Sequence, residues 1–130
     1  MQPDAVARFL VTGFFAVVFI QSAVDKLTDR DGNIAYFSDH FKGSALPVAA
    51  VPLLFWMLTA LEGTAGALCA LGLLLGDFLG KGFGVSACGV SIAGLALLAL
   101  LGGQRLAKDY AGAAVLAAYF AVALIGLHFF

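Results

Sequence analysis

Charged residues are scarce in this sequence. Only 12% of the 130 residues are Asp, Glu, Lys or Arg, whereas 62% are hydrophobic. A typical soluble domain carries about 25% charged residues. A soluble chain of this size could not hide so much apolar surface, because small domains leave a large share of their surface in water. The composition therefore excludes an ordinary soluble domain and favours a protein whose solvent is lipid.

The sequence also lacks the patterns of several functional classes. Its formal net charge is −1 and no cluster of Lys or Arg is present, so it offers no basic surface for a nucleic acid. Cys69 and Cys88 form neither a CxxC motif nor a zinc-type spacing with histidine. His40 and His128 have no second ligand at helical spacing. We therefore expect no nucleic-acid partner and no metal site.

Long apolar runs are what the sequence has in abundance. A membrane-spanning helix needs about 20 mostly apolar residues. Four stretches meet this requirement: about residues 6–24, 52–75, 83–101 and 111–130. Because short links make successive helices antiparallel neighbours, the sequence predicts an all-α fold. We expect one integral membrane domain, residues 1–130, built as an antiparallel bundle of four transmembrane helices.

The first link, about residues 25–51, is the longest. If residues 34–46 are helical, Ile34, Phe37 and Phe41 share one side of that helix. This spacing predicts a short amphipathic segment lying in the membrane interface. A plain connecting loop is the alternative.

Basic residues are unevenly distributed among the links. Cytoplasmic loops carry an excess of Lys and Arg, and the first and third links hold more of them than the opposite side. We therefore expect both termini on the non-cytoplasmic side of a bacterial inner membrane or an organelle inner membrane. The basic residues of the first and third links are Lys26, Arg30, Lys42, Arg105 and Lys108, against Arg8 and Lys81 opposite.

Two segments resemble the DoxX family of small four-helix membrane proteins. The first is FIQSAVDKLTD, residues 19–29, where an apolar run and a small residue precede Lys-Leu and an acidic step. The second is LEGTAGALCALGLLLG, residues 61–76, which is similar to the Glu-containing, Gly-rich second helix of the family. The resemblance covers about the first 80 residues. The family is named for a membrane subunit associated with thiosulfate:quinone oxidoreductase, so the resemblance implies a redox or quinone connection.

Glu62 is the most informative single residue. It lies about ten residues into the second predicted helix, or ~15 Å deep, near the bilayer centre. A carboxylate at this depth is costly unless it is paired, protonated or in a wet cavity. Because no Lys or Arg is expected at that depth, we expect Glu62 to face the bundle interior in the protonated form. On this basis Glu62→Gln should fold nearly normally, whereas Glu62→Lys should not.

Three further residues are expected in the same half of the membrane as Glu62. They are Gln21, Tyr119 and, nearer the surface, Trp56. An aromatic pocket with a few polar groups suits a quinone head group or a structural lipid, so these four residues form a candidate cofactor site. The alternative for each is structural: an interfacial Trp, an interhelical Gln, a core Tyr, and a Glu that joins helices.

Cys69 and Cys88 flank the second link almost symmetrically. Antiparallel helices joined there would place the two sulfurs at similar depth, which does not establish that they face each other. A redox dithiol and two small packing residues are both compatible with the sequence.

Two functions from different classes fit these observations. One is a non-catalytic, mainly structural subunit of a larger membrane complex, engaged in energy transduction or redox chemistry. Its partners would be the lipid bilayer and other membrane subunits. The other is a quinone-linked oxidoreductase subunit of the thiosulfate:quinone type.

Overall fold

The computed structural model describes all residues, 1–130, and is entirely helical. Four α-helices are long and apolar enough to cross a membrane. The predicted all-α architecture with four membrane-spanning helices is therefore confirmed. The long helices are α1 (Pro3–Thr28), α3 (Val51–Leu75), α4 (Val85–Leu106) and α5 (Tyr110–His128).

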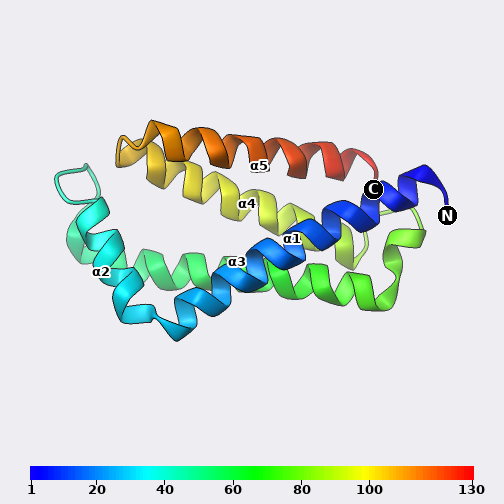
Figure 1. Ribbon diagram of the computed structural model, residues 1–130, viewed down its shortest axis with the longest axis horizontal. Helices are drawn as coiled ribbons and strands as arrows, with labels where there is room; N and C mark the ends of the chain where they lie inside the picture. Colours follow the sequence, from blue (N-terminus) through cyan, green and yellow to red (C-terminus); the bar gives the residue numbers. More distant parts are fainter.

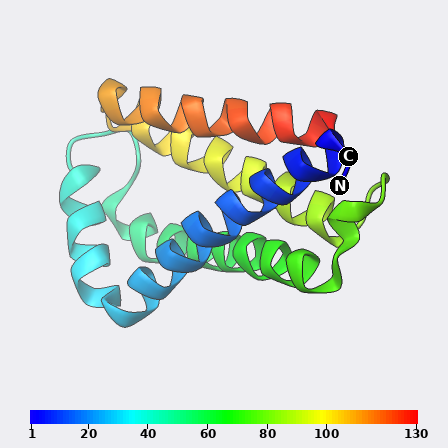
Figure 2. The same cartoon turned by 45° about the vertical axis from the view of Figure 1, so that its right-hand side comes forward.

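The long helices run antiparallel in succession, so both termini lie at one end of the molecule (Figure 1). α3 packs against both α1 and α4, while α5 packs mainly against α4. Figure 2 shows α1 crossing the bundle obliquely and the shorter helix α2 (Arg30–His40) covering the end opposite the termini. Two short 3-10 helices complete the chain: η1 (Val48–Ala50) leads into α3, and η2 (Asp77–Leu79) lies in the turn after it.

Two helices are longer than the sequence predicted. α1 continues to Thr28 instead of ending near residue 24, because Lys26 does not leave the bundle. α4 continues through Gly102 and Gly103 to Leu106. A helical glycine costs only about 1 kcal/mol relative to alanine, and the ring of Phe41 packs closely against the helix at Gly103.

The first link does contain a short helix, with bounds that differ from those expected. The amphipathic segment was predicted for residues 34–46, whereas α2 begins at Arg30, directly after α1, and ends at His40. Gly43 has a positive φ of 80° in the turn that follows. No residue of α2 is fully buried, but Phe37 and His40 are half-buried against the bundle.

Glycines allow the helices to approach closely at their crossings. A Cβ atom added at Gly66 of α3 would stand 2.8 Å from the backbone nitrogen of Ile20 in α1. One added at Gly89 of α4 would stand 2.8 Å from the backbone nitrogen of Cys69 in α3. Small residues permit this packing where lipid provides no hydrophobic drive. The small residues Ser86, Ala87, Gly89, Ala93 and Gly94 of α4 are all buried at these contacts.

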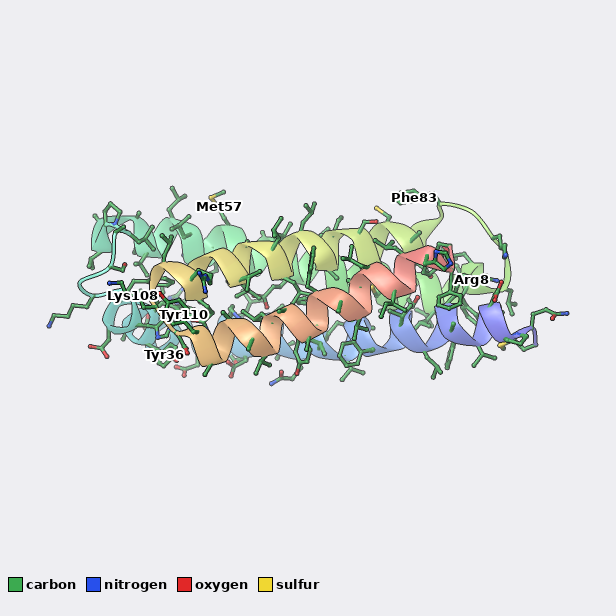
Figure 3. The ribbon with its side chains drawn as sticks, turned by 90° about the horizontal axis from the view of Figure 1, so that it is seen from above. Arg8, Tyr36, Met57, Phe83, Lys108 and Tyr110 are labelled. Carbon is green, nitrogen blue, oxygen red and sulfur yellow. The ribbon has the colours of Figure 1, made fainter.

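Arg8 closes the end of the bundle that holds both termini. Its side chain is 3% exposed. The guanidinium donates to the carbonyl oxygens of Phe78 at 2.6 Å, Phe129 at 3.0 Å and Leu79 at 3.3 Å. Figure 3 shows Arg8 at this end, far from Tyr36, Lys108 and Tyr110 at the other. One buried cation thereby connects α1 to the turn after α3 and to the end of α5.

Candidate functional site

An ion pair lies inside the bundle between α1 and α3. Nζ of Lys26 is 3.2 Å from Oε1 and 3.3 Å from Oε2 of Glu62. The hydroxyl of Ser22, one helical turn before Lys26, donates to Oε2 of Glu62 and accepts from Nζ of Lys26 at 2.9 Å. Glu62 is fully buried and Lys26 is 8% exposed. Three polar side chains thus form a closed cluster within an apolar interior.

One of the two carboxylate oxygens is not fully satisfied. Oε2 of Glu62 accepts hydrogen bonds, whereas Oε1 is buried and has no hydrogen-bond partner. Oε1 is nevertheless 3.2 Å from Nζ of Lys26, so it is attracted by the charge without a well-directed hydrogen bond. The cluster therefore keeps one buried acceptor without a hydrogen-bond donor.

The expectation that no cation lies at the depth of Glu62 is wrong. Glu62 does face the interior, as predicted, but Lys26, which was assigned to the first link, pairs with it. Figure 1 shows why the depth estimate failed: α3 begins beyond the end of α1, alongside α2, so the two helices are not flush. The long side chain of Lys26 then reaches inward to the middle of α3.

The other three predicted site residues do not gather around Glu62. Gln21 lies on the exposed face of α1, although its neighbour Ser22 points inward to Glu62. Trp56 is 41% exposed. Tyr119 is half-buried and packs edge-to-face against Phe14, with 5.6 Å between ring centroids. These residues therefore do not form the predicted quinone pocket with Glu62.

A cavity that the sequence did not predict lies between α2, α3 and α4. Its volume is about 600 Å³, and thirteen of its seventeen lining residues are hydrophobic. α2 contributes Tyr36, Phe37 and His40, α3 contributes Phe55 among others, and the last turns of α4 contribute Gln104. The cavity is therefore mostly apolar with a few polar groups, and it opens to the surface of the bundle, where its lining residues Tyr36 and Met57 are exposed.

His40 and Gln104 provide the polar part of this cavity. Nε2 of His40 is 2.7 Å from Oε1 of Gln104. The carboxylate of Asp109, just before α5, has Oδ2 3.9 Å from the same His40 nitrogen. Asp109 also caps α5, accepting from the backbone nitrogen of Gly112 at 3.0 Å. These contacts fasten α2 to the turn between α4 and α5.

Phe37 connects the cavity with the ion pair. Its ring centroid lies 6.0 Å from Nζ of Lys26 and 6.2 Å from the ring centroid of Phe55. Both phenylalanines line the cavity. Phe37 therefore lies next to both the Lys26–Glu62 pair and the cavity.

Sequence reasoning overlooked His40, Gln104 and Lys26 for different reasons. His40 had no partner at helical spacing because Gln104 is 64 positions away in the chain. The contact of Lys26 could have been found, because Ser22 and Lys26 are four residues apart and so share the buried face of α1.

Cys69 lies in the core and Cys88 is half-buried, and both are free thiols.

No protein-family model, curated protein or solved structure matches this chain.

Proposed function

We propose that this protein is a small, DoxX-like and mainly structural subunit of a larger membrane complex, engaged in energy transduction or redox chemistry. The observation that carries the proposal is the poor burial of α5. Only Ala113, Ala123 and Gly126 are buried in this helix. Of the residues in its apolar, membrane-spanning stretch, 17% are buried. The corresponding stretches of α1, α3 and α4 have 39%, 33% and 44% of their residues buried.

The exposed side of α5 has the composition of a helix-packing surface. Ala114 and Ala118 are four residues apart, as are Ala117 and Ala121, and all four are exposed. Small residues at this spacing let two helix backbones approach closely in a membrane. Lipid chains gain little from such a flat surface, whereas a helix gains close contact along its length. The partner we propose is therefore a membrane-spanning helix of another subunit.

Purification of the full chain from its native membrane in a mild detergent tests this proposal. We expect the protein to elute with at least one partner, identified by mass spectrometry. A photo-crosslinking amino acid at Ala118 should attach to that partner. Ala118→Trp should weaken the association, while Ala67→Trp, on an exposed position of α3, should not. A monodisperse monomer that turns over a soluble electron donor and quinone would overturn the subunit proposal.

A quinone-linked oxidoreductase subunit is the second candidate, and the buried ion pair favours it. Ionisable residues inside a membrane are expensive and commonly mark functional sites. Lys26 and Glu62 meet this description, with one Glu62 oxygen left without a hydrogen-bond donor. Quinone that copurifies with the wild-type protein and is lost in Glu62→Gln would support this function. Equal quinone content in both proteins would contradict a role for the pair.

A further inference from the structure

We propose that the cavity between α2, α3 and α4 binds a neutral amphiphile, with its apolar chain between α3 and α4 and a hydroxyl or carbonyl head group beside His40 and Gln104. The cavity is separate from the exposed face of α5, so binding there does not depend on membership of a complex. It rests on the size of the cavity, its lining and the charge at its polar end.

The size and lining suit a ligand with a long apolar part. Small-molecule sites usually measure about 300–1,000 Å³ and are mostly apolar with a few polar groups. This cavity, at about 600 Å³, lies within that range. The aromatic surface comes from Tyr36, Phe37, Phe41 and Phe55. Most of the remaining apolar lining residues are leucines of α3 and α4. An apolar chain would fill space that no protein side chain occupies.

The polar end can hydrogen-bond a head group. Gln104 uses its Oε1 with His40, and its amide nitrogen, which lies beside Gly112 at the start of α5, makes no hydrogen bond within the protein. An amide N–H can donate to a carbonyl or hydroxyl oxygen. Tyr36 stacks on His40, with 5.6 Å between ring centroids and an interplanar angle of 16°. The imidazole is thereby held in place against Gln104.

The carboxylate of Asp109 disfavours an anionic head group directly beside His40. Oδ2 of Asp109 is 3.9 Å from Nε2 of His40, so a second carboxylate beside His40 would face a like charge. A neutral head group avoids this repulsion and still accepts from Gln104. The geometry therefore favours a fatty alcohol or similar neutral lipid over a fatty acid.

Photolabelling of the full chain in detergent, with a diazirine-bearing hexadecanol and the matching hexadecanoic acid, tests the proposal. We expect the alcohol to label residues of α2 and the last turns of α4. Ala99→Trp, which places a large side chain in the cavity lining, should abolish this labelling. Leu98→Trp is the matched control, because Leu98 is 51% exposed and does not line the cavity. Gln104→Leu should weaken alcohol binding several-fold to about tenfold through loss of its hydrogen bond.

Asp109→Asn tests the selection by charge. Asn caps helices about as well as Asp, so the start of α5 should be preserved. We expect the wild-type protein to prefer the alcohol to the acid, and Asp109→Asn to reduce or remove this preference. Labelling spread evenly over the lipid-facing helices, unchanged by Ala99→Trp, would overturn the site. A wild-type preference for the acid would overturn the choice of ligand.

Discussion

The ammonium nitrogen of Lys26 in α1 lies 3.2 Å from a carboxylate oxygen of Glu62 in α3. Along the chain, α2 and the turns around it separate these two helices. Neither residue has another oppositely charged partner. Removing one residue of a buried pair leaves the other charge uncompensated, and this is strongly destabilising. The pair is therefore the most sensitive point of the α1–α3 contact.

We expect Glu62→Gln to lower the free energy of unfolding by about 3–5 kcal/mol, because Lys26 would remain buried without a counter-charge. This replaces the expectation from sequence that Glu62→Gln folds nearly normally. The double variant Lys26→Met/Glu62→Leu should be more stable than either single variant. Denaturant unfolding of the wild type, Lys26→Met, Glu62→Leu and the double variant in the same detergent completes the double-mutant cycle. Additive effects of the two single changes would show that the charges do not interact.

Arg8→Met should lower the free energy of unfolding by about 2–4 kcal/mol, because three carbonyl oxygens lose a charged donor. Lys81→Met is the control at the same end of the bundle. Lys81 pairs with Asp4 at 3.0 Å, but its side chain is 70% exposed. Such a pair contributes about 0–1 kcal/mol. Thermal unfolding of the two variants should therefore separate them clearly, and equal losses would contradict a structural role for Arg8.

Two glycines on α1 and α3 offer a direct comparison of helix packing. A Cβ at Gly66 would stand 2.8 Å from the backbone of Ile20, whereas one at Gly13 would meet no atom within 4 Å. Gly66→Ala should destabilise the protein by about 1–3 kcal/mol because α1 must move away from α3. Gly13→Ala should be neutral or stabilise it by up to about 1 kcal/mol through helix propensity. A thermal melt of each variant measures the difference, and a stabilised Gly66→Ala would exclude the close crossing.

Accessibility of the links tests the predicted orientation. Arg30→Cys and Arg105→Cys, each in a Cys69→Ala/Cys88→Ala background, should react with a membrane-impermeant thiol reagent only after the membrane is opened. Lys81→Cys, at the opposite end, should react in intact cells or vesicles of native orientation. Labelling of Arg30→Cys or Arg105→Cys from outside would reverse the topology inferred from the distribution of basic residues.

The sequence was sufficient for the architecture because hydropathy alone identifies helices that can span a membrane. It also identified the inward position of Glu62. Which side chains contact one another was harder to predict, because this depends on the position of one helix along the axis of its neighbour. The offset between α1 and α3 brings Lys26 to Glu62, and the rotation of α1 turns Ser22 inward and Gln21 outward. The cavity depends on the path of α2, and His40 and Gln104 are brought together across 64 positions of the chain.

The location of the two charges on α1 and α3 also has a consequence for biogenesis. α1 leaves the ribosome first, so Lys26 enters the membrane before Glu62 does. Lys26 can extend to the water interface during this interval. When α3 arrives, only one rotational and vertical alignment brings the charges together, since a slip of one turn moves them ~5.4 Å apart. Pairing of Lys26 with Glu62 therefore fixes the register of α1 against α3 as the bundle assembles.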